Sequence, residues 1–321
     1  MNYENFKKII ENNILSQMPE EYQKLGLKVK IREFQKTNVK YDGLTFEKPN
    51  LTNKVSPIIY IQPLYETYKN GISLKEIFDQ IVKVIIESFE KSKKIELPND
   101  MKNKDKIKEN IVFMLINTDA NKEMLVSVPH RKYMDLSIVY RWIISIDEEG
   151  IQSTLIDNNL LNMLELDENE LFLLASKNTK RLMPPTINTM NEIINSILLK
   201  FRNDPEMIDE IIKENLAYPA YKFMWVISNK VKINGAISII YEDILHNLAE
   251  RLNSDLYILP SSIHEVIVLS ANEFNQLDYL SKMVTEVNND QVKKNERLSN
   301  NVYYYDKKER TMFLVTDNSN I

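Results

Sequence analysis

Glycine is scarce in this sequence, and its five copies stand far apart: Gly26, Gly43, Gly71, Gly150 and Gly235. A loop that cradles a phosphate group needs several glycines close together, because side chains would keep the backbone N–H groups away from the anion. Neither the spacing of a Walker loop nor that of a dinucleotide-binding loop can be written from five isolated glycines. The sequence therefore excludes the standard P-loop and Rossmann nucleotide sites.

The remaining composition is that of an ordinary globular protein. The chain has 321 residues, 43% of them hydrophobic, which is long enough for one large core or two smaller ones. It has no cysteine, so disulfides and thiolate-bound metals are excluded. The first residues mix charge with apolar side chains, unlike a signal peptide, and no stretch is apolar enough to cross a membrane. We expect a cytoplasmic protein that does not bind membranes.

Apolar side chains recur with two periods along the chain. Stripes at helical spacing predict amphipathic helices, the clearest over 74–89, 190–201 and 280–287, whereas strict alternation over 27–31 and 136–144 predicts strands. Short strand pairs alternate with helices, and no strand–helix–strand unit repeats. The sequence therefore predicts an α+β fold with antiparallel or mixed sheets. We expect two lobes, an N-terminal α+β lobe over 1–160 and a C-terminal α+β lobe over 161–321 in which helix and strand pair alternate twice.

Three local expectations follow from turn and helix signals. Asp42-Gly43 is typical of a tight turn, so a strand is expected to begin at Leu44. A single helix is expected from Asn234 to Leu252, because apolar residues follow one face throughout. The strands 257–259 and 266–269 flank Pro260-Ser261-Ser262 and are expected to pair as a hairpin.

Histidine, serine and carboxylate residues supply the candidates for catalysis. His130 and Asp135 lie in a loop that runs into a strand, and His264 follows Ser261 and Ser262 and precedes Glu265. A serine–histidine–acid arrangement can be drawn from these residues, but no Gly-x-Ser-x-Gly elbow exposes either serine. The alternative is a hairpin whose serines and histidine satisfy turn backbone groups, and we favour it. We expect the His130–Asp135 and Ser261–Glu265 segments to lie on the same side of the molecule.

Metal and nucleic-acid sites are less well supported. His130, His264, Asp135 and Glu265 could form a carboxylate-rich metal set, but no zinc-type spacing such as His-Glu-x-x-His occurs. His246 is expected to face solvent. The lysine-rich runs 91–94 and 102–108 are interrupted by acids or short, which favours solvated helix ends over a nucleic-acid groove. We expect no metal, no cofactor and a partner that is another protein, with nucleic acid disfavoured.

A set of short segments spread over the chain carries a resemblance to a known family: Ser56–Ile61, Val128–His130 with Asp135-Leu136, Ala175 with Asn178-Thr179 and Leu182, Val226–Lys230 with Gly235-Ala236, Tyr257–Val266, Glu286–Asn288, and Leu298-Ser299 with Val302-Tyr303 and Tyr305-Asp306. In these segments the chain resembles a bacterial family known as domain of unknown function 5688, common in gut-associated Firmicutes. The C-terminal third more distantly resembles the uncharacterised YtpQ-type proteins of Bacillus relatives. The resemblance implies a cytoplasmic bacterial protein and carries no established activity, cofactor or partner. Three asparagines within the matching segments, Asn178, Asn229 and Asn288, are candidates for binding.

Two functions remain open on these grounds. The first, which we favour, is a non-enzymatic binding or regulatory protein, because the chain has no glycine loop, no cysteine and only three histidines. The alternative is a hydrolase or nuclease-like enzyme that uses His130, Asp135, His264 and Glu265 in a shared cleft.

Overall fold

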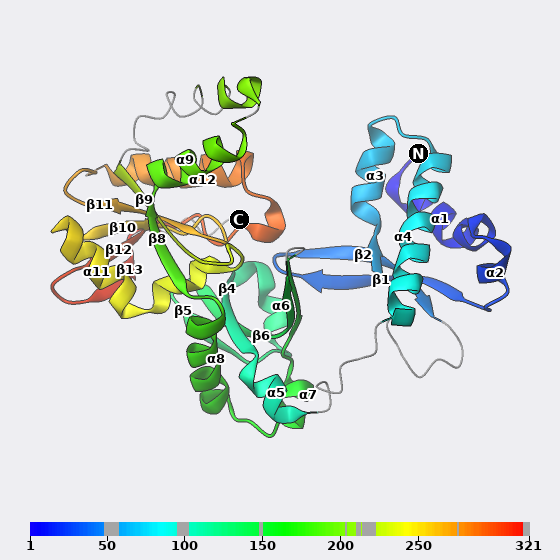
Figure 1. Ribbon diagram of the computed structural model, residues 1–321, viewed down its shortest axis with the longest axis horizontal. Coiled ribbons are helices and arrows are strands. Elements are labelled where there is room, and N and C mark those ends of the chain that lie inside the picture. The colour runs from blue at the N-terminus through cyan, green and yellow to red at the C-terminus, as the bar shows by residue number, and fades with distance from the viewer. Residues whose placement is uncertain are drawn as a thin grey trace. The chain divides into compact units, whose positions relative to one another are not determined.

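The computed structural model describes residues 1–47, 58–94, 103–147, 150–202, 204–209, 213, 223–274 and 276–316. Two stretches named above, Ser56–Ile61 and the lysine-rich run 102–108, lie partly outside them. The chain forms two compact units, Met1–Asn103 and Lys104–Ile321. Every strand pairing in the described parts is antiparallel, and helices accompany each sheet, which confirms the expected α+β class with antiparallel sheets (Figure 1).

The first unit, blue to cyan in Figure 1, is a three-stranded sheet with helices on one face. The sheet has the order β1-β2-β3, and its apolar face contributes Leu44 and Phe46 to the core. Helix α1 adds Phe6, Ile10 and Ile14, spaced to lie on one side of the helix. The elements are α1 (Tyr3–Gln17), α2 (Glu20–Gln23), β1 (Lys28–Lys36), β2 (Val39–Glu47), β3 (Ile58–Tyr60), α3 (Ile61–Lys69) and α4 (Leu74–Lys94).

The expected turn at Asp42-Gly43 is wrong. Strands β1 and β2 form an unbroken nine-residue ladder, and the chain reverses at Thr37 and Asn38, where Asn38 has a φ of 62°. Gly43 lies within β2 for a packing reason: a Cβ there would come within 2.5 Å of the Phe34 ring and 2.6 Å of Ile58. A glycine inside a strand thus marks close packing here, although the dipeptide is typical of a turn.

The second unit contains two antiparallel sheets. One has six strands in the order β13-β12-β10-β11-β9-β8, and the other has the order β4-β6-β5, with β7 also paired to β6. Its elements are α5 (Lys104–Glu109), β4 (Ile111–Asn117), α6 (Lys122–Leu125), β5 (His130–Tyr133), β6 (Leu136–Asp147), β7 (Gly150–Leu155), α7 (Asn158–Met163), α8 (Glu168–Leu182), β8 (Pro185–Thr189), α9 (Met190–Lys200), β9 (Met224–Asn229), the 3-10 helix η4 (Gly235–Ile240), α11 (Glu242–Leu252), β10 (Leu256–Leu259), β11 (Val266–Ser270), α12 (Leu277–Asp290), β12 (Tyr303–Asp306) and β13 (Thr311–Leu314).

The six-stranded sheet is covered on both faces. Alternate residues of β10, such as Tyr257 and Leu259, pack with Leu280 and Val284 of α12, and Figure 1 shows α9 on the same side of the sheet. The intervening residues, such as Ile258, pack toward α11, η4 and the second sheet. The period-two pattern of the sequence therefore divides between two separate apolar layers.

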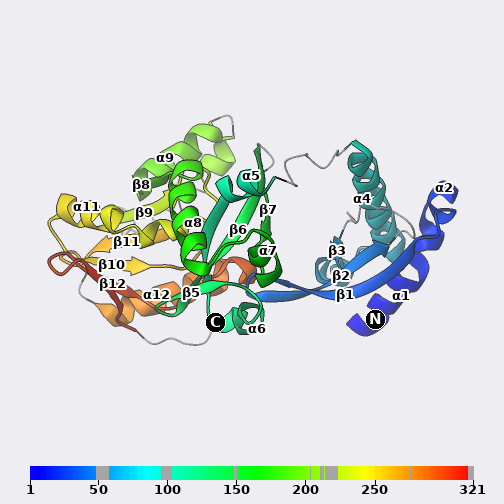
Figure 2. The same ribbon diagram turned by 90° about the horizontal axis from the view of Figure 1, so that it is seen from below.

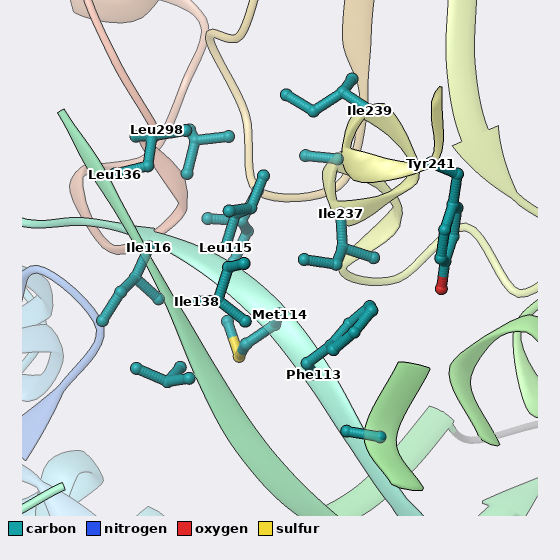
Figure 3. Packing of buried hydrophobic residues seen from close by; sticks show 14 of the residues in the cluster. Phe113, Met114, Leu115, Ile116, Leu136, Ile138, Ile237, Ile239, Tyr241 and Leu298 are labelled. Carbon is teal, nitrogen blue, oxygen red and sulfur yellow. The ribbon is translucent and has the colours of Figure 1, made fainter. Parts of the chain in front are cut away.

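The largest core joins the two sheets of the second unit. Figure 3 shows Phe113 and Leu115 of β4 beside Ile237 and Tyr241, with Leu298 close to Leu136. Helix α8 packs against β4 of the second sheet, and Figure 2 shows α8 beside β6 of the same sheet. The elements on either side of residue 160 therefore share one apolar core.

The boundary between the units differs from the expected division into 1–160 and 161–321. Residue 160 lies inside α7, within the second unit. Helix α8 is fixed to β4 across that position, because the Phe113 backbone N–H donates to Thr179 Oγ1 at 3.1 Å. Sequence spacing does not reveal a contact between residues so far apart in the chain.

Several elements differ in detail from expectation. The stretch 234–252 is two helices, η4 and α11, separated at Tyr241. His130 begins strand β5 and does not lie in a loop, and β8 begins at Pro185, where an edge strand tolerates proline. His246 is half-buried beside Arg310, and Arg310 Nη2 lies 2.8 Å from His246 Nε2.

Of the helices in the described parts, none is both long and apolar enough to cross a membrane.

Candidate functional site

Asp135 lies in the tight turn between β5 and β6, next to Met134, whose φ is +55°. Its carboxylate accepts hydrogen bonds from Ser299 Oγ at 2.6 Å, from Asn301 Nδ2 at 2.9 Å and from the Tyr303 hydroxyl. All three donors come from one segment that leads into β12. Asp135 therefore fixes the C-terminal segment to the second sheet through three hydrogen bonds.

The Tyr303 hydroxyl is buried in this arrangement. Burial, reinforced by the neighbouring Asp135 carboxylate, raises the pKa of Tyr303 well above its usual value. The phenol therefore stays protonated and donates to the carboxylate. A hydrogen bond to a charged acceptor is stronger than one between neutral groups, which favours this fixed geometry.

Amide side chains extend the same network. Asn117 Nδ2 donates to the Leu298 carbonyl at 3.0 Å, and Asn288 Nδ2 donates to the Ser299 carbonyl at 2.9 Å. The backbone of segment 298–301 is thus held from β4 and from α12 at once.

The serines and His264 occupy the connection between β10 and β11. Ser262 Oγ accepts from the His264 backbone N–H at 3.0 Å, so this serine caps a turn. The Leu298 N–H donates to the Ser261 carbonyl, and the Ser299 N–H donates to the Pro260 carbonyl, both at 2.9 Å. The interpretation of a hydrogen-bonded turn is in keeping with these contacts.

The His264 side chain is held by the segment before η4. Its Nδ1 accepts from the Asn234 backbone N–H at 3.2 Å, and its carbonyl accepts from Ser228 Oγ at 2.8 Å. A Cβ on Gly235 would lie 2.5 Å from that same carbonyl and 2.8 Å from the Asn229 nitrogen. Only glycine allows the two segments to approach this closely.

The structure brings the Asp135 turn and the Ser261 turn to the same segment, 298–303, but gives the histidines separate partners. His130 Nδ1 donates to the Val128 carbonyl at 2.8 Å, and its side chain is exposed. Glu265 is exposed as well. Within the described ranges, no hydrogen bond joins either histidine ring to Asp135 or Glu265. In a catalytic triad an acid orients the histidine base through a hydrogen bond. Neither Asp135 nor Glu265 orients His130 or His264 in this way.

Each of the three candidate asparagines donates a side-chain hydrogen bond to a backbone carbonyl. Asn178 Nδ2 donates to the Lys108 and Ile111 carbonyls at 2.7 and 3.1 Å, which fixes α8 to the start of β4. Asn229 Nδ2 donates to the Ile233 carbonyl at 2.8 Å. The Oδ1 atoms of Asn229 and Asn288 are buried and have no hydrogen-bond partner among the described residues.

Sequence reasoning missed Ser299, Asn301 and Arg141. The first two belong to a polar run, Ser299-Asn300-Asn301, placed directly before a strand, and this is the signal that could have revealed them. Arg141 donates through Nε and Nη2 to Ser153 Oγ and O at 2.8 and 3.0 Å. Burial lowers the pKa of Arg141. Among the residues that the structure describes, no three histidine or carboxylate side chains are arranged to hold a metal ion.

A second candidate site is the sheet face of the first unit that points away from the core; we call it the open face. It is defined by the residues of β1, β2 and β3 whose side chains alternate with those in the core. Ile58 is 41% exposed, Phe34 packs over Gly43, and the Tyr41 and Tyr60 rings lie 5.0 Å apart. Its members are Lys28, Lys30, Arg32, Phe34, Lys36, Val39, Tyr41, Gly43, Thr45, Glu47, Ile58 and Tyr60.

The open face combines aromatic rings with positive charge. Lys36 Nζ lies 4.4 Å from the centre of the Tyr60 ring, and Arg32 pairs with Glu47. Lys28 and Lys30 are exposed, and within the described chain they form no ion pair. The periodicity of β1 signals these alternate positions, but only the pairing of β3 with β2 adds Ile58 and Tyr60 to them.

One protein family matches most of the length of the chain. The model of a family of unknown function, DUF5688, matches residues 3–307, which spans both units. No curated protein and no solved structure matches the chain. Since the match covers nearly the whole length, the chain belongs to the DUF5688 family of unknown function.

Proposed function

We propose that this chain is a non-enzymatic binding protein of the bacterial cytoplasm and that the open face of its first unit is the contact surface. The observation that carries the proposal is the open face itself. It presents half-buried aromatic rings, the exposed Ile58 and several exposed cations on a rigid sheet. Exposed apolar and aromatic groups on rigid elements are typical of interaction surfaces.

The polar residues of the second unit support the same proposal. Asp135 and His264 each hold a chain segment in place, through contacts to Ser299, Asn301, Tyr303 and Asn234. Groups engaged in this way are explained by stability, and a catalytic role is not needed to account for them. The proposal assigns the second unit a structural role and the first unit the binding role.

Site-specific photo-crosslinking tests the proposal. A benzophenone amino acid replaces Ile58 on the open face, and the matched control carries it at Leu173, which is 68% exposed on α8. In extract of the organism that encodes the chain, a discrete adduct is expected from position 58 and none from position 173. Absence of an adduct at position 58 would overturn the assignment of the surface.

A second measurement tests the absence of catalysis. The purified chain is incubated with bis-p-nitrophenyl phosphate and with p-nitrophenyl acetate, and no turnover above that of the His264→Asn variant is expected. Turnover that His264→Asn and His130→Asn both abolish, with unchanged melting temperatures, would establish the hydrolase alternative in its place.

A further inference from the structure

We infer that the open face binds single-stranded nucleic acid, with phosphates on its cations and bases stacked on its aromatic rings. This inference rests on the proposed binding function and names the class of partner. It differs from the expectation of a protein partner, which disfavoured nucleic acid because the chain is acidic overall and its lysine-rich runs are typical of solvated helix ends. The cations of the open face, Lys28, Lys30, Arg32 and Lys36, are spaced two or four residues apart on a strand and do not form a run.

Positive charge is concentrated on this face, although the whole chain has a net charge of −5. Every second residue of β1 from Lys28 to Arg32 is a cation, and Lys36 continues the row after Phe34. Glu47 is the one carboxylate among the twelve members of the face, and it pairs with Arg32. Residues two apart on a strand lie about 7 Å from each other, so the row provides a line of charge suited to a polyanion.

Three aromatic rings lie beside this row. Phe34 is part of it, and Tyr41 is the cross-strand partner of Phe34. Tyr60 of β3 contacts Tyr41 and lies under the Lys36 ammonium group. All three rings are half-buried, so the packed sheet fixes their orientation while part of each remains accessible. Bases stack on rings of this kind without regard to sequence.

The rings distinguish this partner from an acidic polypeptide. Coulombic attraction alone would serve either polyanion, but the acidic side chains of a peptide have no aromatic rings to stack on the three rings of the face. A double helix is also less suitable, because its bases are already stacked and paired. Single-stranded nucleic acid uses both features of the face, its cations and its rings.

Fluorescence anisotropy with the full chain tests the inference. The probes are labelled oligo(U) and oligo(dT) of about 12 nucleotides, and an oligo-glutamate peptide of matched charge serves as the competing polyanion. The variants are Lys30→Glu and Tyr60→Ala. Lys8→Glu, which makes the same charge change on an exposed position of α1, and Tyr60→Phe, which keeps a ring, are the controls.

The oligonucleotides are expected to bind more tightly than oligo-glutamate. A plot of log affinity against log salt concentration should have a slope of about −2 to −3, since each single-strand phosphate contact contributes about −0.7. Tyr60→Ala should weaken binding by about 5- to 100-fold, while Tyr60→Phe should not, because one stacked base is worth that range. Lys30→Glu should weaken binding and flatten the slope, and Lys8→Glu should do neither. Circular dichroism melts confirm that each variant is folded.

Two outcomes would overturn the inference. If oligo-glutamate binds as tightly as the oligonucleotides and Tyr60→Ala has no effect, the face takes an acidic polypeptide and the proposed binding function stands. If no probe binds, single-stranded nucleic acid is excluded, and the crosslink at position 58 decides the binding function separately. An adduct that resists ribonuclease and deoxyribonuclease would agree with either of these outcomes.

Discussion

Asp135 joins the β5–β6 turn of the second unit to the segment that leads into β12. Its carboxylate accepts three side-chain hydrogen bonds, from Ser299, Asn301 and Tyr303. A carboxylate has acceptor sites for all three, whereas an amide would direct an N–H group at a donor. The carboxylate is therefore required for the fit between the β5–β6 turn and the segment before β12.

Replacing Asp135 with asparagine should lower the free energy of unfolding by about 2–3 kcal/mol, the cost of leaving buried donors without an acceptor. Urea denaturation followed by tryptophan fluorescence measures it. The control is Glu265→Gln, which removes a charge from an exposed side chain and should change stability by about 0.5 kcal/mol or less. An Asp135→Asn variant as stable as the parent would refute the structural role assigned to this carboxylate.

Gly235 permits the closest backbone approach in the neighbourhood of His264. An added Cβ would lie 2.3 Å from Ser228 Oγ and 2.5 Å from the His264 carbonyl oxygen. Gly235→Ala should therefore destabilise the chain by about 2–3 kcal/mol, because backbone atoms must move. Asn234→Gly is the matched control, because Asn234 has a φ of 53°, which glycine adopts freely. The free energy of unfolding of this variant should stay within about 1 kcal/mol of that of the parent. Equal effects in the same denaturation experiment would show that sterics at residue 235 are not the cause.

At the scale of elements, local signals predicted most helices and strands correctly. The helix expected over 74–89 is α4, whose first turn is capped by Ser73 and Glu76, and the 257–259 and 266–269 strands pair as a hairpin. The errors occur where tertiary packing decides. Gly43 reads as a turn residue until Phe34 and Ile58 are placed against it, and the 234–252 stripe reads as one helix although Tyr241 breaks it. Single-residue spacing contains no information about such long-range neighbours.

The candidate site was predictable only in part, for the same reason. The sequence indicated Asp135, Ser262 and His264 as polar residues near turns, and each is indeed in or beside one. It did not indicate that Asp135 is bonded to residues 164 to 168 positions away, since no local pattern couples them. The open face was missed because it needs β3 beside β2.

The buried tyrosine of strand β12, Tyr303, makes the stability of the protein depend on pH in the alkaline range. Tyr303 is buried with a pKa well above its usual value. Below about pH 10 the phenol is protonated in both states, so its contribution is fully present. Above that pH the unfolded chain ionises first, and stability falls as pH rises toward the folded-state pKa.

The free energy of unfolding should therefore decrease above about pH 10, by up to about 1.4 kcal/mol per pH unit for this tyrosine. Tyr303→Phe should make the decrease shallower. Tyr279→Phe, at a side chain that is 51% exposed on α12, is the control and should keep the parental slope. Urea denaturation at a series of pH values measures the slopes. Identical slopes for the parent and Tyr303→Phe would contradict the assignment of a buried, protonated phenol.

At the scale of the whole molecule, the two compact units have separate cores. Among the residues that the structure describes, the core of the first unit draws only on those before 90, and the largest core of the second unit begins at Ile107. A division near residue 160 would instead separate β4 from α8, whose contact includes the bonds from Asn178 to the Lys108 and Ile111 carbonyls. The two ways of cutting the chain therefore predict opposite behaviour of the fragments.

Fragments 1–103 and 104–321 should each fold alone, giving cooperative thermal transitions and dispersed NMR spectra, because each keeps its apolar core intact. Fragments 1–160 and 161–321 are the matched comparison. Fragment 161–321 should lack a cooperative transition. Without β4, its core residues Ile237 and Leu298 would lose the packing of Phe113 and Leu115 and would be exposed to water. Expression, solubility and calorimetry of the four fragments decide between the two divisions. A cooperative melt of 161–321 combined with an unfolded 104–321 would place the boundary at residue 160 and refute the division after Asn103.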